Sequence, residues 1–159
     1  MTLPAGEASA VRGIARPKKR KDSNPARRFA LRGRSLIQID VELPDRPGEL
    51  AKLAKVLSDA SINIDAISAE SGGSRAYVSL IVDQPARARV ALKGAGYGYA
   101  ERTVLVCTLE DRPGALAALA GKLGDAGVNI TSVIQLESSG GRVQMAIGVD
   151  DLAKARAFV

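Results

Sequence analysis

The stretch Asp45-Arg46-Pro47-Gly48 decides how this chain folds, because it returns unchanged 66 positions later as Asp111-Arg112-Pro113-Gly114. Residues 45–64, DRPGELAKLAKVLSDASINI, and residues 111–130, DRPGALAALAGKLGDAGVNI, are identical at thirteen of twenty positions without a gap. Repetition of this kind indicates two copies of one small structural unit. The best-preserved part is a predicted strand-to-helix turn, a place where free backbone amides can hold an anion.

Hydrophobic spacing around the first turn predicts the elements of the first copy. Apolar residues alternate over 36–43, which indicates a strand, and Pro47 suits the first turn of the helix that follows. Leucines at 50, 53 and 57 give this helix one apolar stripe to about residue 60. The remaining predicted elements are a strand over 62–71, a Gly72-Gly73 turn, a strand over 75–82, a helix over 84–93 and a strand from about Tyr97.

The second copy repeats this order up to its second helix. Its predicted elements are a strand over 103–109, a helix over 113–126, a strand over 128–137, a Gly140-Gly141 turn, a strand over 142–149 and a helix from Asp150. With the sequence ending at Val159, we expect this copy to lack its last strand. The strand over 103–109 would then carry an unpaired edge unless something covers it.

The two copies differ by one residue inside the second strand. Five residues separate Ile64 from Glu70, whereas six separate Ile130 from Glu137. The alternation of apolar residues also breaks after Ile64. Both observations predict a β-bulge in the second strand of at least one copy.

The element order βαββαβ predicts an α+β fold of two ferredoxin-like sandwiches in tandem, each with two crossover helices on an antiparallel sheet. The expected organisation is a disordered basic tail at 1–34, a first domain at 35–101 and a second, truncated domain at 102–159. Each unit is near the smallest size that buries an adequate core. We therefore expect the two copies to share a surface.

Charge and composition narrow the function classes. Residues 1–34 hold ten Lys or Arg against two acids, about +8, which leaves 13 basic and 15 acidic residues over 35–159. The tail is either a solvated leader or a weak nucleic-acid contact; without interleaved aromatics, nucleic-acid binding is not expected. No apolar run approaches the roughly 18 residues that cross a bilayer. A single cysteine and no secretion signal predict a cytoplasmic protein without a membrane partner.

Catalysis is not expected from this composition. The chain has no histidine, and its one cysteine, Cys107, lies on a predicted strand without a neighbouring base. The carboxylates form no cluster dense enough to bind a metal ion, and the Gly-Gly pairs match no phosphate loop. We therefore predict no catalytic residue, no metal and no cofactor.

The repeated turn offers the groups that a free amino acid needs. The N–H groups of Gly48, Glu49 and Leu50 have no partner inside the helix, and the helix dipole favours a carboxylate there. Asp45 and Asn63 offer acceptors for an ammonium group. The same residues also have a structural interpretation, because Asp, Pro-Gly and Asn are common at helix starts and turns. Both interpretations remain open at this point.

The strand, the Asp-Arg-Pro-Gly-x-Leu turn, the leucine-striped helix and the following Ile/Val-Asn-Ile together resemble the ACT domain, a regulatory module that binds amino acids. Two such units without a catalytic domain resemble the stand-alone tandem-ACT proteins. The resemblance covers about residues 35–159 and implies modules that pair side by side, with small ligands at the interface. The ligand-facing residues that it implies are Asp45, Arg46, Pro47, Gly48, Glu49, Leu50, Asn63, Ile64, Asp111, Arg112, Pro113, Gly114, Ala115, Leu116, Asn129 and Ile130.

The expected function is a regulatory module that binds an amino acid between paired domains. Its expected partners are the amino acid and either a second copy, forming a homodimer, or a regulated enzyme. The alternative is a ligand-independent, protein-interaction regulator of the glycine-cleavage type, which the arrangement also resembles. The turn does not specify which amino acid binds, because the carboxylate and amine that it would contact are shared by all of them.

Overall fold

The computed structural model describes residues 34–159, so the prediction for the tail lies almost entirely outside the described residues. The predicted α+β fold with its repeated element order is confirmed. The described elements are β1 (Ser35–Pro44), α2 (Glu49–Asp59), β2 (Ile64–Gly72), β3 (Arg75–Val82), α3 (Pro85–Gly94), β4 (Tyr99–Glu110), α4 (Ala115–Asp125), β5 (Ile130–Ser139), β6 (Arg142–Val149) and α5 (Leu152–Ala155).

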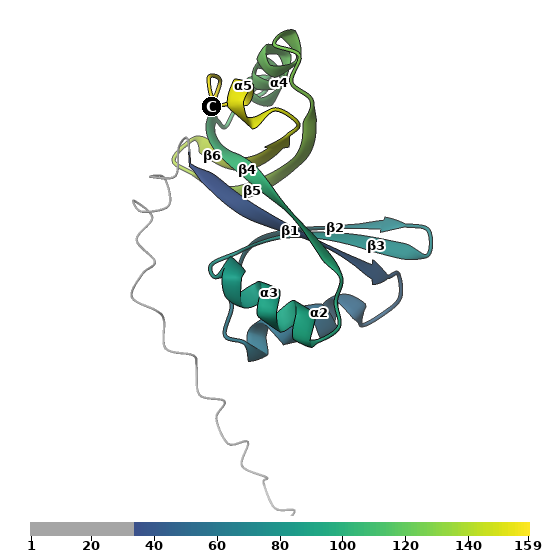
Figure 1. The fold of residues 1–159 in the computed structure, drawn as a ribbon. Helices are drawn as coiled ribbons and strands as arrows, with labels where there is room; N and C mark the ends of the chain where they lie inside the picture. The colour runs from purple at the N-terminus through teal and green to yellow at the C-terminus, as the bar shows by residue number, and fades with distance from the viewer. Residues whose placement is uncertain (1–33) are drawn as a thin grey trace, which may run out of the picture.

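The strands of the described chain form one antiparallel sheet in the order β2-β3-β1-β4-β6-β5. Figure 1 shows β1 and β4 crossing at the centre, with α2 and α3 at one end and α4 and α5 at the other. The sheet twists strongly between these ends, so that its two outermost strands, β2 and β5, contact each other. No helix of the described chain is long and apolar enough to cross a bilayer.

Strand β4 joins the two modules. The sequence predicts one strand from about Tyr97 and another over 103–109, but the structure has a single strand, Tyr99–Glu110. Its first half pairs with β1 and its second half with β6, and both pairings meet at Leu105. No glycine or proline interrupts YAERTVLVCTLE, so nothing in the sequence ends the extended backbone between the modules.

The predicted unpaired edge of the second copy is partly covered. The start of β1 lies beside β4, with Ser35 opposite Leu105. The Val106 N–H also donates to the Arg34 carbonyl oxygen at 2.9 Å. Strand β1 therefore pairs with β4 across the boundary between the modules.

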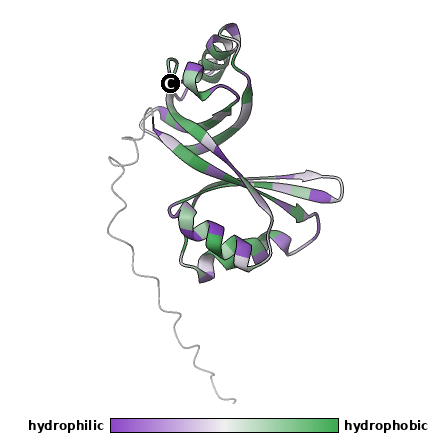
Figure 2. Ribbon diagram, in the orientation of Figure 1, coloured by the Kyte–Doolittle hydropathy of each residue, from purple (hydrophilic) through white to green (hydrophobic). Residues whose placement is uncertain are grey.

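Three apolar clusters stabilise the fold. In the first, Ile39, Val41 and Leu43 of β1 pack against α2 and α3, and in the second Leu105 and Cys107 of β4 pack against α4 and α5. Figure 2 shows hydrophobic and hydrophilic segments alternating along the helices, as expected for helices that cover one face of a sheet. The third cluster lies on the sheet face opposite the described helices. It joins the modules through Ala66, Ile81, Val104, Ile134 and Ala146.

The predicted β-bulge is present in both copies. The pairing register shifts between Ile64 and Ala66 in β2 and between Ile130 and Ser132 in β5. A further shift between Gln135 and Glu137 in β5 accounts for the one extra residue of the second copy.

Replacing Leu57 with alanine should lower the free energy of unfolding by about 2–5 kcal/mol, because this side chain of α2 is fully buried and its removal leaves a cavity. Leu50→Ala on the same helix is the matched control. Because Leu50 is 44% exposed, its replacement should lower the free energy of unfolding much less. Urea unfolding followed by circular dichroism measures both. Equal losses for the two variants would contradict this packing.

Candidate functional site at the repeated helix start

Both repeated turns present an uncapped helix start. Gly48 before α2 has φ +90°, and Gly114 before α4 has φ +86°, a left-handed conformation that favours glycine. Within residues 34–159, neither helix has a side chain bonded to its first amides. Of the three amides predicted to be free, the Glu49 N–H donates to the Arg46 carbonyl oxygen at 3.4 Å, whereas those of Gly48 and Leu50 have no backbone partner in the described residues. The space in front of both glycines is open, because an added Cβ would meet no atom within 4 Å.

A small hollow adjoins the first of these turns. It has a volume of about 190 Å³ and lies between the start of α2 and strand β2. The predicted residues Asp45, Arg46, Glu49 and Leu50 line it, together with residues 69–71 of β2, which the sequence did not indicate. The structure therefore brings the first predicted stretch to the edge of the sheet.

The aspartate of each turn binds a serine of the neighbouring hairpin. The Ser71 hydroxyl donates to the Asp45 carboxylate, and the Ser138 hydroxyl donates to the Asp111 carboxylate at 2.9 Å. Both serines come shortly before a predicted glycine turn, the one sequence feature that could have identified them. These contacts show that each aspartate has a structural role in holding the turn to the sheet.

The two helix starts carry different charges. Glu49 in the first turn of α2 is buried and accepts from Lys52 Nζ at 2.9 Å and from Arg46 Nε at 2.8 Å. The hydrogen bonds from Lys52 and then Arg46 hold the pKa of Glu49 below its ordinary value. The first helix start therefore already contains a carboxylate with two cationic partners.

The second helix start has no such carboxylate. Alanines at 115 and 118 replace Glu49 and Lys52. Arg112 instead bonds to Glu110 at the end of β4, and this bond lowers the pKa of Glu110. The first turn of α4 is thus more open to an external anion than that of α2.

The second predicted stretch lies at the other end of the helix. Asn63 and Ile64 line a separate hollow with Ala54 and Ser58. Helix α2 spans Glu49–Asp59, which makes it about 16 Å long at a rise of roughly 1.5 Å for each residue. Within one module the two predicted stretches are far apart. A ligand that touches both would have to lie between two modules.

Both asparagines are held by an aspartate that follows the third strand of the module. The Asn63 N–H donates to Asp83 Oδ1, and the Asn129 N–H donates to Asp150 Oδ1, each at 2.9 Å. The Asn63 side-chain amide also donates to Asp65 Oδ1 at 2.9 Å. These bonds fix the start of β2 and β5.

Cys107 lies in the second apolar cluster and contacts the Met145 carbonyl oxygen at 3.6 Å. Burial raises the pKa of the Cys107 thiol to about 11. The thiolate is the nucleophilic form, so the geometry gives Cys107 a packing role. Within residues 34–159, no three His, Cys, Asp or Glu side chains gather in a way that could hold a metal ion.

The ACT domain family model matches this chain twice, over residues 37–92 and 103–153. The two matches coincide with the two repeats and include both helix starts. No curated protein sequence matches the chain.

Solved structures with a similar fold include the protein BT0572 from Bacteroides thetaiotaomicron, which is 23% identical, with a TM-score of 0.71. That match covers 78% of this chain and 85% of the other chain. The regulatory subunit of aspartate kinase from Thermus flavus is 24% identical over 76% of this chain and 86% of its own, with a TM-score of 0.59. The corresponding subunit from Thermus thermophilus is 25% identical over 70% and 81%, with a TM-score of 0.52.

Glu49→Gln should lower the free energy of unfolding at pH 7. It should also make this free energy decrease less steeply as the pH falls from about 5 to 3. A carboxylate whose pKa is lowered in the folded state stabilises the fold above its unfolded pKa, about 4.3, and this contribution disappears as the pH falls through the folded pKa. Unfolding measured across this pH range provides the test.

Asp59→Asn is the control for that variant, because it removes an exposed carboxylate of α2 that pairs with Lys55. If Asp59→Asn lowers the free energy of unfolding as much as Glu49→Gln does, the buried ion pairs at the helix start stabilise the fold no more than an exposed pair.

Proposed function

Because the chain belongs to the ACT domain family, with one domain in each repeat, we propose that it is a regulatory module that binds a free amino acid between paired domains. It has no catalytic activity of its own. Binding is passed on to a regulated enzyme or to a second copy of the chain. It acts in the cytoplasm.

The observation that carries this proposal is the pair of uncapped helix starts behind Gly48 and Gly114. Each offers free amides to a carboxylate, and the helix dipole adds a favourable potential for an anion. The open space in front of each glycine gives access to those amides. A site of this kind selects the carboxylate that all amino acids share.

Pairing of modules is supported by two equivalent apolar positions. Leu50 at the start of α2 and Ile67 on the edge strand β2 are large and exposed. The equivalent residues of the second module, Leu116 and Val133, are also exposed. Exposed apolar side chains at the edge of a sheet favour contact with another module. A ligand between modules could then reach a helix start of one and an asparagine of the other.

The proposal that this chain regulates an enzyme is based on two similar structures. The two Thermus proteins are described as regulatory subunits of aspartate kinase. We propose that this chain is likewise a regulatory subunit, without specifying the enzyme.

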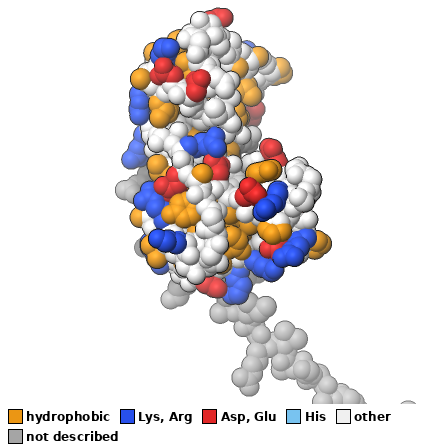
Figure 3. All heavy atoms as spheres, turned by 45° about the vertical axis from the view of Figure 1, so that its right-hand side comes forward, with side chains coloured by type: hydrophobic (Ala, Val, Ile, Leu, Met, Phe, Trp, Pro, Cys, Tyr) orange, Lys and Arg blue, Asp and Glu red, His pale blue; other side chains and the backbone are white. Residues whose placement is uncertain are grey.

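The ligand-independent alternative also has support in the structure. The Asp45 carboxylate already accepts from Ser71, and the Asn63 side-chain amide donates to Asp65, so both side chains already have a role within the fold. A partner protein that binds equally well with and without amino acids would favour this alternative. Nucleic-acid binding has less support, because Figure 3 shows basic and acidic side chains interspersed on the visible face.

A thermal-shift screen of the twenty amino acids should identify at least one that raises the melting temperature. A ligand that binds only the folded state stabilises it by about 2.7 kcal/mol at one hundred times its Kd. If none of the twenty changes the melting temperature at millimolar concentration, the amino-acid proposal is wrong.

Gly114→Leu should abolish this ligand-induced shift if the second helix start binds the carboxylate. Gly114→Ala is the matched control, because it introduces the same strain at a left-handed position without the bulk. That strain costs roughly 1–2 kcal/mol, so we expect both variants to melt earlier than the native chain. Only Gly114→Ala should keep its response to the ligand, and a full response in Gly114→Leu would exclude this site.

A further inference from the structure

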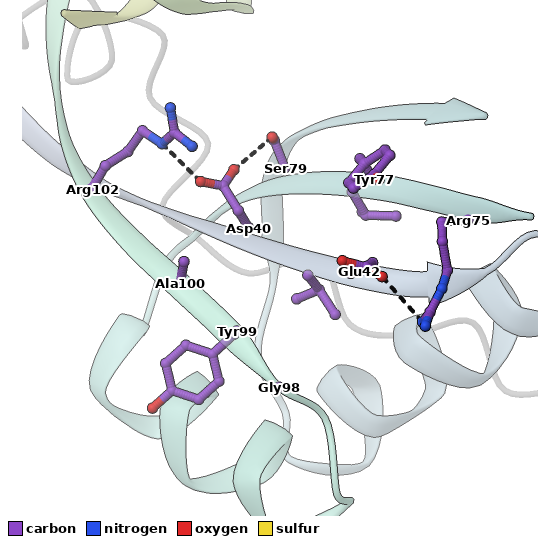
Figure 4. A pocket seen from close by; sticks show the side chains of 11 residues that line it. Asp40, Glu42, Arg75, Tyr77, Ser79, Gly98, Tyr99, Ala100 and Arg102 are labelled. Atoms are coloured by element: carbon purple, nitrogen blue, oxygen red, sulfur yellow. Dashed lines mark hydrogen bonds and ion pairs between the residues drawn. The ribbon is translucent and has the colours of Figure 1, made fainter. Parts of the chain in front are cut away.

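A polar hollow, called the seam hollow below, lies between the modules on the sheet face opposite the described helices. The seam hollow has a volume of about 180 Å³. The strands of the first module line it with Gln38, Ser68, Glu70, Tyr77, Ser79 and Arg102, and β5 of the second lines it with residues 131–134. It shares Ser79 and Arg102 with a wider hollow over β1, β3 and β4, which Figure 4 shows.

The β-bulge at the start of β5 directs two hydroxyl groups into this seam. The register shift between Ile130 and Ser132 leaves Thr131 unpaired. A Cβ on Gly148 would lie 2.3 Å from Ser132 Oγ and 2.9 Å from Thr131 Oγ1. Both hydroxyls therefore lie over Gly148, the residue opposite Ser132, and only a glycine leaves room for them. Ser132 Oγ donates to Gln38 Oε1 of the other module at 2.9 Å.

Arg102 is held at the seam by a partly buried polar network. Its Nε donates to Asp40 Oδ2 at 2.7 Å. Asp40 Oδ1 accepts from Ser79 Oγ at 2.7 Å and from Gln38 Nε2 at 2.6 Å, and Gln38 is only 1% exposed. Figure 4 shows Arg102 and Ser79 both pointing at the Asp40 carboxylate.

This network leaves most of the guanidinium donors available. Among the described residues, the one contact of the Arg102 terminal nitrogens is a long one, 3.5 Å from Nη1 to Thr131 Oγ1. The two terminal nitrogens of an arginine match the two oxygens of a carboxylate. An arginine fixed through its Nε therefore presents a preformed fork for such a group.

The repeat shows that the seam does not need these polar residues for packing. The equivalents of Gln38, Asp40 and Ser79 in the second module are Val104, Val106 and Ala146. The equivalents of Ser132 and Gly148 in the first module are Ala66 and Ile81. Four of these five form the apolar cluster between the modules. The two modules thus make two equivalent contacts with each other. One is filled by apolar side chains, and the other is lined by polar side chains and encloses the seam hollow.

We propose that the seam hollow is a second ligand site, distinct from the helix starts, and that it takes a small carboxylate. Arg102 Nη1 and Nη2 bind the two carboxylate oxygens, and the Thr131 hydroxyl donates a third hydrogen bond. Because Arg102 lies on the half of β4 that pairs with β1 of the first module, whereas Thr131 lies on β5 of the second, an occupied site links the two modules. The seam site does not depend on amino-acid binding at the helix starts.

The test follows the arginine Nε–H signals of the full chain by NMR during titration with sodium acetate, glycine and, for ionic strength, sodium chloride. Arg89 is an internal reference, because its Nε also donates to a carboxylate at 2.7 Å and its side chain is 43% exposed, against 42% for Arg102. The Arg102 signal, assigned by its loss in Arg102→Lys, should shift and saturate with acetate or glycine and stay unchanged with chloride. The Arg89 signal should stay unchanged throughout.

Two variants separate this site from the helix starts. Thr131→Val keeps the shape and removes the hydroxyl, and should weaken carboxylate binding about tenfold, the effect of losing one hydrogen bond to a charged group. Gly114→Leu should leave the Arg102 response intact. Equal, unsaturated shifts of Arg89 and Arg102, or no Arg102 shift at 100 mM acetate and glycine, would overturn the proposal.

Discussion

Strand β4 belongs to both modules, and the rest of the structure depends on this shared backbone. Its first half completes the sheet of the first module, and its second half begins the sheet of the second. An extended strand has little freedom to bend, because its amides are paired on both sides where the modules meet. The crossing of β1 and β4 therefore sets how the helix-free faces of the two modules approach each other. The apolar cluster and the polar seam both form at that approach.

The duplication preserves the backbone of the two modules more closely than their charges. Gly48 and Gly114 have nearly the same φ and precede helices of equal length. In contrast, Glu49 neutralises cations at the first helix start, while Ala115 leaves the second one clear. A backbone conformation that requires glycine tolerates few substitutions, whereas the next position holds a glutamate paired with two cations in one copy and an alanine in the other. Two copies of one fold can thus acquire different binding preferences.

The sequence predicts the elements well where a short local pattern is sufficient. The Gly140-Gly141 turn and the strand over 142–149 are confirmed, and the length mismatch after Ile130 correctly predicts a bulge. The sequence analysis missed the merging of two predicted strands into β4, because the repeat assigns one strand to each module, although no glycine or proline interrupts residues 99–110. The seam hollow was also not predicted. Its residues come from five strands, and Gln38 and Ser132 are 94 positions apart.

The sequence by itself determined the repeated fold and the two helix starts, because both follow from short-range periodicity and from a proline-glycine turn with one favourable geometry. Only the tertiary structure decided which side chains share a hollow. It placed Asn63 away from Asp45 within a module, since the rigid helix between them keeps them apart. It also placed Arg102 beside Thr131 across two modules, because the twist of a shared strand brings the two helix-free faces together.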